Sequence, residues 1–201
     1  MNDATIRAAT RADAPDIARL VLVSAERFLP AVFGTGIEAA VCALAAGRGT
    51  LFSHAHCWIA EAGGSTAGIM LGYSGREKAA EDPATGWGLL RTLGVGLVRR
   101  LGRLLVLQRT IGKLGADEFY VSNVAVYPDF QGRGIGSALL AAAERAAGDT
   151  GAAWIVLDVE TDNLSAIRLY QGRGYAASGA TSPMRLEGHE FSFLRMGMPI
   201  G

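Results

Sequence analysis

The stretch FYVSNVAVYPDFQGRGIGSALL, residues 119–140, decides the fold of this 201-residue chain. Residues 119–126 are β-branched and aromatic, which predicts a strand, and 127–130 end it with a proline. Glycines at 132, 134 and 136 then lead into a helix predicted over 135–147. Glycines let backbone amides approach an anion closely, and a helix N-terminus favours negative charge. A phosphate or pyrophosphate is therefore the expected guest of this loop.

Three interpretations of the loop compete. A P-loop requires GxxxxGK[ST], and this loop contains no lysine. A dinucleotide fingerprint is nearly matched over 132–137, and Asp158 lies where an acidic ribose ligand would sit. Four residues separate this loop from its strand, however, and little chain follows it for a doubly wound domain. A tight turn from strand to helix without a ligand is the third interpretation.

Working outward, strands and helices alternate along the chain, which predicts a mixed α/β or α+β layer fold. Thr10, with Asp13 three residues on, is the expected N-cap of the first helix, which ends near residues 28–30. The other expected elements are a strand over 5–9, a helix over 36–46, a hairpin of 57–61 and 67–73, an exposed loop over 74–86, a basic amphipathic helix or helix pair over 87–114, a buried strand over 153–159, a helix over 163–171 and a final strand over 190–198.

Composition narrows the classes of protein. Lys+Arg and Asp+Glu each number 19, so net charge gives no reason to expect a nucleic acid partner. Cys42 and Cys57 form no CxxC pair, which suits a reducing compartment. We expect a cytoplasmic protein with neither a secretory signal nor a membrane span. His54 and His56 share a face only if they lie on a strand, and no further ligand pattern accompanies them, so no metal is expected.

Two motifs together point to a family. Residues 124–136, VAVYPDFQGRGIG, resemble the central motif of the GNAT superfamily of N-acetyltransferases, and 162–175, DNLSAIRLYQGRGY, resemble its second signature. Residues 6–13 are similar to the family's usual start. The resemblance implies a mixed, mostly antiparallel sheet with splayed central parallel strands, flanked by helices. It implies one domain over 1–201, with a helical insert at about 86–115.

The implied activity is transfer of an acetyl group from acetyl-CoA to a primary amine of a small molecule or peptide. No cysteine lies near the motifs to act as a nucleophile, so we expect direct transfer in a ternary complex. A non-catalytic acyl-CoA-binding or sensing module on the same fold is the alternative. The insert is open to three uses: a lid or wall of the acceptor pocket, a homodimer contact, or a membrane-surface helix.

The resemblance also assigns coenzyme-binding residues. In the family the strand matching 119–126 carries a bulge, and the backbone of Val124 and Val126 would hold the pantetheine arm. The amide of Val126 would polarise the thioester carbonyl, and the amides of 132–137 would hold the pyrophosphate. The residues expected to bind acetyl-CoA are Val124, Ala125, Val126, Gln131, Gly132, Arg133, Gly134, Ile135, Gly136, Ser137, Asn163, Ala166 and Tyr170.

Asn163 and Tyr170 are seven residues apart, which places both on one face of a helix. Tyr170 matches the family's usual general acid, which protonates the departing thiolate. A helix N-cap for Asn163 and simple packing for Tyr170 remain the alternative roles.

In many members of the family an acidic group on or near the bulged strand acts as the general base, often through water. The resemblance therefore implies Glu118, which starts the strand and by alternation shares a face with Tyr120 and Ser122. The alternatives left open for this role are Asp117, Glu26 and Glu160.

Overall fold

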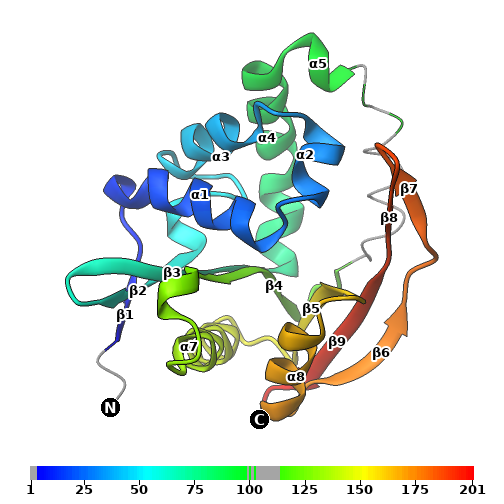
Figure 1. Ribbon diagram of the computed structural model, residues 1–201. Coiled ribbons are helices and arrows are strands. Elements are labelled where there is room, and N and C mark those ends of the chain that lie inside the picture. The colour runs from blue at the N-terminus through cyan, green and yellow to red at the C-terminus, as the bar shows by residue number, and fades with distance from the viewer. Residues whose placement is uncertain (1–3, 99, 101, 103–113) are drawn as a thin grey trace.

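The computed structural model describes residues 4–98, 100, 102 and 114–201. Its main feature is a seven-stranded sheet in the order β1-β2-β3-β4-β5-β9-β6 (Figure 1). Among the described residues, every neighbouring pair in this sheet is antiparallel except β4 and β5, which are parallel. The strands are β1 Thr5–Ala8, β2 Cys57–Ala62, β3 Ser65–Ser74, β4 Glu118–Val126, β5 Trp154–Glu160, β6 Ala176–Ala180 and β9 Phe193–Pro199, and a separate hairpin pairs β7 Met184–Leu186 with β8 His189–Phe191.

Helices cover both faces of the sheet. The helices α1 to α4 lie above it in Figure 1, whereas α7 and α8 lie below. The expected mixed sheet with a central parallel pair and flanking helices is therefore confirmed. The helices are α1 Ala14–Ser24, α2 Phe28–Phe33, α3 Ile37–Ala45, α4 Gly75–Leu93, α5 Val95–Val98, α7 Ile135–Asp149 and α8 Leu164–Gly172, with 3-10 turns η1 Arg11–Asp13, η2 His54–His56 and η3 Pro128–Phe130.

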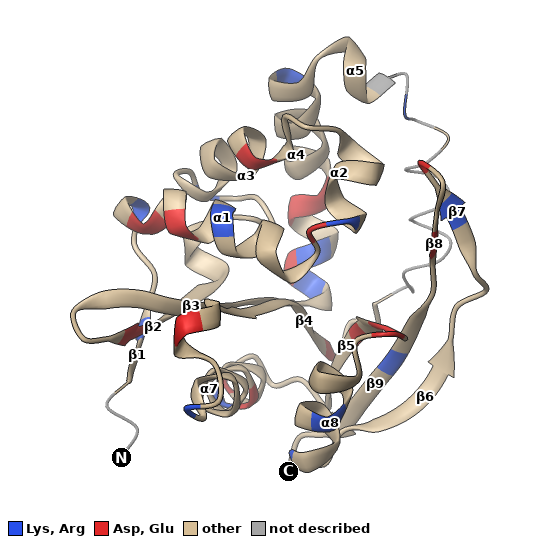
Figure 2. Ribbon diagram, viewed as in Figure 1, with Lys and Arg blue, Asp and Glu red and all other residues tan. Residues whose placement is uncertain are grey.

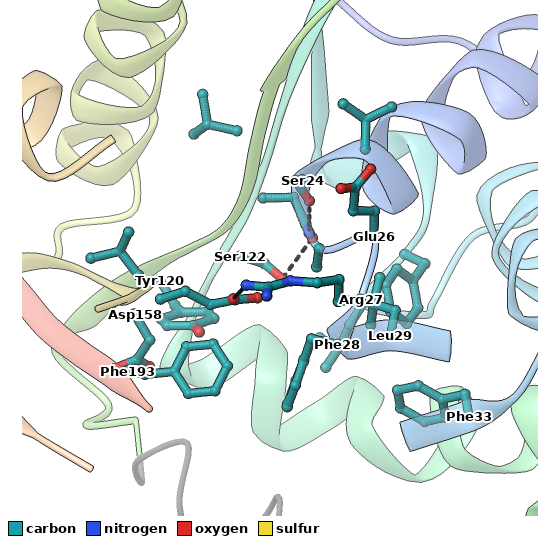
Figure 3. A pocket seen from close by; sticks show the side chains of 18 of the residues that line it. Ser24, Glu26, Arg27, Phe28, Leu29, Phe33, Tyr120, Ser122, Asp158 and Phe193 are labelled. Carbon is teal, nitrogen blue, oxygen red and sulfur yellow. Dashed lines mark hydrogen bonds and ion pairs between the residues drawn. The ribbon is translucent and has the colours of Figure 1, made fainter. Parts of the chain in front are cut away.

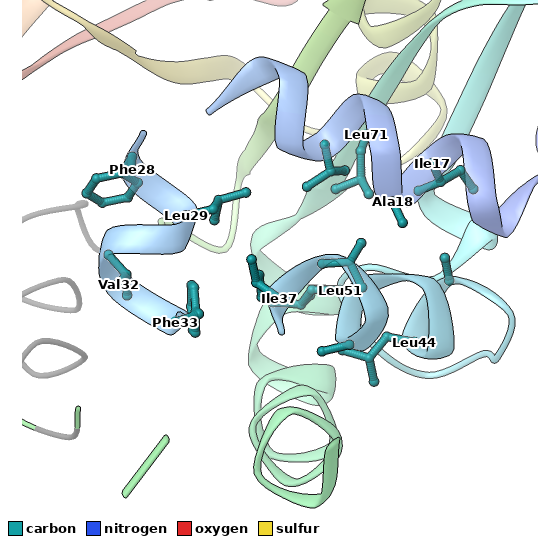
Figure 4. Close-up of a cluster of buried hydrophobic side chains, with 14 of the residues drawn as sticks. Ile17, Ala18, Phe28, Leu29, Val32, Phe33, Ile37, Leu44, Leu51 and Leu71 are labelled. Atoms are coloured by element: carbon teal, nitrogen blue, oxygen red, sulfur yellow. The ribbon is translucent and has the colours of Figure 1, made fainter. Parts of the chain in front are cut away.

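Two hydrophobic cores lie on the two faces. On one face, Ile17 of α1, Phe33 of α2 and Ile37 of α3 form one buried cluster with Leu71 of the sheet (Figure 4). On the other face, Leu139 and Leu140 of α7 are fully buried against the strands. Because both faces are covered, the central strands are apolar along most of their length, as the sequence 153–159 predicts.

The central parallel pair separates part of the way along. β4 and β5 pair from Glu118↔Trp154 to Val121↔Leu157, and no further pair joins them within the described residues. On its other side β4 stays paired with β3, but the register shifts so that Ser122 is an extra residue. This is the β-bulge that the family resemblance implies, and a bulge bends its strand and increases its twist. The two strands consequently splay beyond Val121.

The exposed loop expected over 74–86 is wrong, because α4 begins at Gly75. The Ser74 hydroxyl accepts a hydrogen bond from the Glu77 amide (3.2 Å), and the Glu77 carboxylate accepts one from the Ser74 amide (2.7 Å). This capping box satisfies two amides and starts a helix despite the turn-forming residues that follow. Part of the expected insert helix over 87–114 belongs to α4 and α5, and residues 99, 101 and 103–113 lie outside the described part of the chain.

Replacing Ser74 with Ala removes the hydroxyl that caps α4. We expect the free energy of unfolding to fall by about 1 kcal/mol, the usual cost of losing such a cap. Urea unfolding measures this change. Ser178→Ala on the exposed edge strand β6 is the control, and an equal loss in both variants would contradict a specific role for the capping box.

The first helix is also shorter than expected, because α1 ends at Ser24 and a new helix begins at Phe28. The Ser24 hydroxyl donates to the Val21 carbonyl (2.7 Å), a local bond that competes with helix continuation. Pro30 has no amide with which to continue the ladder. The connection between the two helices lies over the separating strands, because Asn123 of β4 donates to the Ser24 hydroxyl and Arg27 binds Glu160 of β5. The strands β6 and β7 were not expected, and the expected final strand over 190–198 is divided between β8 and β9.

Candidate functional site

A cavity of about 1010 Å³ opens where β4 and β5 separate. Its walls come from β4, β5, the connection from α1 to α2, α4 and α8. Figure 3 shows Tyr120 and Asp158 at one end of the cavity and Phe33 of α2 at the other, with the rings of Phe193 and Phe28 side by side between them. The separation of the strands thus leaves a cavity between them. The helices of one face of the sheet line one part of it, and α8 from the other face lines another part.

Backbone groups of β4 face this opening. The Tyr127 amide donates to the Ala67 carbonyl of β3 (2.9 Å). Because backbone groups alternate in direction along a strand, the amides of Val126 and Val124 point the other way, toward β5. That side of β4 is unpaired within the described residues beyond Val121. An extended ligand can therefore bind there as an added strand would.

The glycine loop lies exposed between β4 and α7. Gly132 and Gly134 have φ values of 73° and 77°, a conformation that other residues rarely adopt. Gly134 is the N-cap of α7 and has no side chain to cap it, so the first-turn amides of this helix are available to a ligand. The expected anion cradle is thus present as a backbone conformation.

Side chains brace the loop. The Gln131 amide group donates to the Val126 carbonyl (3.0 Å). The Arg133 guanidinium donates to the Asp129 carbonyl (2.6 Å) and lies 5.3 Å from the centre of the Phe130 ring. Both side chains therefore hold the loop in shape, and both are exposed beside it.

Helix α8 places Asn163, Ala166 and Tyr170 on the cavity wall. The side-chain oxygen of Asn163, Oδ1, accepts a hydrogen bond from the Ala166 amide (3.1 Å). Asn163 is therefore the N-cap of α8 as well as a residue that lines the cavity. Tyr170 is 8% exposed, and burial raises its pKa to about 12. Its phenol therefore stays protonated, and able to donate a proton, throughout the neutral range.

Two carboxylates of β5, Asp158 and Glu160, line the cavity, and burial is the main cause that raises the pKa of each. The Asp158 side chain is 3% exposed, and one of its oxygens accepts from Arg195 (3.1 Å). Arg27 binds Glu160 (3.0 Å) and also Asp162 (2.8 Å), which ties the α1–α2 connection to the end of β5. In Figure 2 acidic and basic residues gather on these facing segments.

The structure does not bring Glu118, the expected base, to this cavity. Its carboxylate accepts from the Gly115 amide (2.7 Å) and contacts Arg195 (3.4 Å), and it is not among the described residues that line the walls. Tyr120 and Ser122, on the same face, do line it. The sequence points to Asp158 only through the dinucleotide interpretation, as a ligand of the ribose. Period-2 alternation from Val156 to Glu160 is the signal that places Asp158 on the cavity face of β5.

The two neighbouring histidines lie in the 3-10 turn η2 rather than on a strand. His54 Nδ1 bonds the Ala45 carbonyl (2.7 Å), and His56 Nε2 bonds the Glu81 carboxylate (2.8 Å). In the described ranges no group of three or more His, Cys, Asp or Glu side chains could hold a metal ion. Nor is any helix of those ranges long and apolar enough to cross a membrane.

A splayed parallel pair with a bulge, a glycine cradle at a helix N-terminus and a tyrosine on the next helix together define a class of coenzyme-dependent transferase. The model described as Acetyltransferase (GNAT) family matches residues 38–175. The chain therefore belongs to the GNAT acetyltransferase family, which confirms the resemblance seen in its motifs.

Three proteins that are similar to this chain differ in how much of it they match. Mycothiol acetyltransferase of Nocardiopsis dassonvillei is 46% identical over 59 residues, which are 29% of this chain and 17% of that protein. A crystal structure of an acetyltransferase is 25% identical, covers 98% of this chain and 100% of its own, and has a TM-score of 0.67. N-acetyltransferase from Staphylococcus aureus Mu50, 19% identical over 96% of this chain and 100% of its own, has a TM-score of 0.71 and shows the shared fold.

The dinucleotide interpretation is contradicted by this fold. A doubly wound domain requires a mostly parallel sheet, whereas only β4 and β5 are parallel among the described strands. Asp158 also faces Arg195 rather than the glycine loop.

Proposed function

We propose that this protein transfers an acetyl group from acetyl-CoA to a primary amine by direct transfer in a ternary complex. The observation that carries the proposal is that the unpaired β4 backbone at Val124 and the buried phenol of Tyr170 line one cavity. The glycine loop lies next to the same helix, because a Cβ added to Gly136 would be 3.1 Å from Leu169 of α8. When bound, acetyl-CoA supplies the activated thioester. A cytoplasmic location fits the two free thiols, Cys42 and Cys57.

The chain's own residues would bind acetyl-CoA in two parts. The amides at 132–137 and the N-terminal end of α7 bind the pyrophosphate, with Arg133 adding positive charge at the rim. The outward backbone of Val124 and Val126 binds the pantetheine, with Ala125 between them, and Asn163 and Ala166 form the opposite wall. The Val126 amide is directed so that it can polarise the thioester carbonyl.

Proton transfer is assigned to two buried groups. Asp158 accepts a proton from the incoming ammonium, which frees the nitrogen lone pair. The nitrogen–carbon bond forms as the carbon–sulfur bond breaks, and the nitrogen releases a second proton to water. Tyr170 donates its phenolic proton to the thiolate and regains one from solvent, so the products are an amide, a thiol and one net proton. Glu118 is a positioning residue here, because it holds the Arg195 guanidinium that also binds Asp158.

A valine at Gly134 is expected to weaken acetyl-CoA binding by about 10- to 100-fold. A β-branched residue is strained at positive φ, so the cradle would distort and lose charge-assisted bonds to phosphate, each worth roughly 1.5–3 kcal/mol. Calorimetric titration of acetyl-CoA measures the dissociation constant. A titration with NAD in parallel tests the coenzyme itself.

Gly151→Val is the matched control. Gly151 has φ 70° and lies in the turn after α7, so the valine imposes a similar strain away from the cavity. Equal affinity in wild type and Gly134→Val, or tight NAD binding with no response to acetyl-CoA, would count against the proposed coenzyme site.

A further inference from the structure

The acceptor side of the cavity has a wall formed by one face of α4. The lining residues of this helix are Lys78, Asp82, Thr85, Gly86, Leu89 and Leu90, which recur at helical spacing. Gly86 is the member of this set without a side chain. Gly86 is exposed, and a Cβ added there would meet no described atom within 4 Å, so the lining has open space at this point, which we call the recess at Gly86.

Gly88, two residues on, makes the contrast clear. A Cβ there would lie 2.4 Å from a methyl carbon of Leu44, so Gly88 lets α4 approach α3 closely. At position 86 no neighbouring helix in the described part of the chain is close enough to require a glycine. The lack of a side chain at Gly86 instead enlarges the cavity beside Leu89 and Leu90.

The wall facing α4 is apolar and aromatic. Phe28 and Phe193 pack edge to face, with ring centres 4.9 Å apart, and Phe33 continues the same side (Figure 3). These three rings are at most 8% exposed, so their positions are fixed by the core behind them. The volume of about 1010 Å³ is at the upper end for small-molecule sites, which leaves room for an acceptor beside the pantetheine.

The charges of the residues that line the cavity favour one kind of acceptor group. Among the described residues that line it, five carry carboxylates and two carry cationic groups; these are Glu26, Asp82, Asp158, Glu160 and Asp162, and Arg27 and Lys78. Both cations already contact lining carboxylates, since Lys78 pairs with Asp82 and Arg27 with Glu160 and Asp162. Arg195 offsets a further carboxylate, Asp158, yet the described part of the lining still carries more negative than positive charge. This remaining negative charge attracts an ammonium group and repels acidic acceptors.

We infer that the acceptor is a primary amine with an apolar alkyl or arylalkyl group, its ammonium beside Asp158 and its apolar part between the phenylalanine wall and the recess at Gly86. This inference rests on the proposed acetyl transfer. Gly86 is then the residue that sets how large an apolar group the site accepts.

The test measures release of CoA thiol with unbranched alkylamines from propylamine to octylamine, and with 2-phenylethylamine, spermidine and a lysine peptide. For the alkylamines kcat/KM should rise by about 2- to 4-fold per methylene, because each one is transferred from water to the apolar wall. Spermidine and the peptide should fall well below octylamine. A flat alkylamine series, or a preference for the polar acceptors, would overturn the inference and leave acetyl transfer standing.

Gly86→Leu fills the recess and is the decisive variant. We expect kcat/KM for octylamine to fall by at least about 10-fold, while propylamine changes by less than about 3-fold, because the lost volume corresponds to several buried methylenes. The melting temperature should be unchanged or about 2–4 °C higher, since leucine favours a helix over glycine. Gly148→Leu in α7, where a Cβ meets only Ile200 at 3.9 Å, is the matched control.

Direct binding separates failure of this inference from failure of the proposed function. Octylamine is titrated calorimetrically into the protein saturated with CoA. Binding that Gly86→Leu abolishes supports the apolar site even where thiol release is absent, whereas no octylamine binding in wild type overturns it. Equal loss of propylamine and octylamine turnover in Gly86→Leu would also overturn it.

Discussion

Tyr170→Phe is expected to lower kcat by about 10²- to 10⁴-fold while the dissociation constant of acetyl-CoA changes by less than about 3-fold, the range for loss of a general acid. The variant keeps the ring, which packs against Tyr175 with centres 5.9 Å apart, and removes only the hydroxyl. Stopped-time assays of thiol release give kcat, and calorimetry gives the affinity. Because burial raises the pKa of Tyr170 to about 12, its phenol should not limit the wild-type rate below about pH 11.

Tyr175→Phe is the matched control for this prediction. Tyr175 is 2% exposed and lies on the same side of the sheet, and its hydroxyl finds no hydrogen-bond partner within the described residues. Removing that hydroxyl should leave kcat unchanged and stability equal or higher, because a buried unsatisfied polar group is lost. An unaltered rate in Tyr170→Phe would remove this residue from its proposed role.

Asp158→Asn is expected to lower kcat/KM at pH 7 by about 10²- to 10⁴-fold, because the amide cannot accept the ammonium proton. Burial raises the pKa of Asp158, and the carboxylate is active only above that pKa. The wild-type rate should therefore fall as the pH drops through it. In the variant this fall of kcat/KM at low pH, the acid limb of the profile, should have no contribution from Asp158. Its kcat/KM should instead rise with pH as a larger fraction of the amine is unprotonated. The pH profile of kcat/KM provides the measurement.

Asp158→Asn removes both the proposed base and its ion pair with Arg195, so a control must measure the effect of losing such an ion pair alone. Glu144→Gln removes a carboxylate that, like Asp158, is paired with an arginine, Arg173, but lies on α7 away from the cavity. Melting temperature and acetyl-CoA affinity report whether each variant is folded. If Asp158→Asn keeps the acid limb of the wild-type profile, another group is the base, and Glu160 becomes the next candidate.

Much of the catalytic framework could be predicted from local patterns. The strand 119–126, the glycine loop and the helix that follows are adjacent in sequence, so their arrangement depends on short-range geometry. Asn163 and Tyr170 share a helix face for the same reason. The predictions for these elements hold because each residue's environment is formed largely by its own neighbours.

Local patterns predict less where distant segments meet. The family resemblance and strand alternation both pointed to Glu118 as the base, but neither shows that Arg195, from β9 near the far end of the chain, binds its carboxylate. The α1–α2 connection is held at the cavity in part by Arg27, which pairs with residues more than 130 positions away. The first part of α4, up to residue 86, is predicted as a loop when its glycines and proline are weighted above the Ser74–Glu77 capping box.

Amine-dependent release of CoA thiol tests the central proposal most directly. The protein is incubated with acetyl-CoA and 2-phenylethylamine, free thiol is quantified, and the N-acetylated amine is identified by mass spectrometry. We predict one equivalent of amide for each equivalent of thiol, at a rate that depends on both substrates and is nearly abolished in Tyr170→Phe. Tight binding of acetyl-CoA with no acceleration of thiol release by any amine in the panel would contradict an enzymatic role and favour an acyl-CoA-binding module.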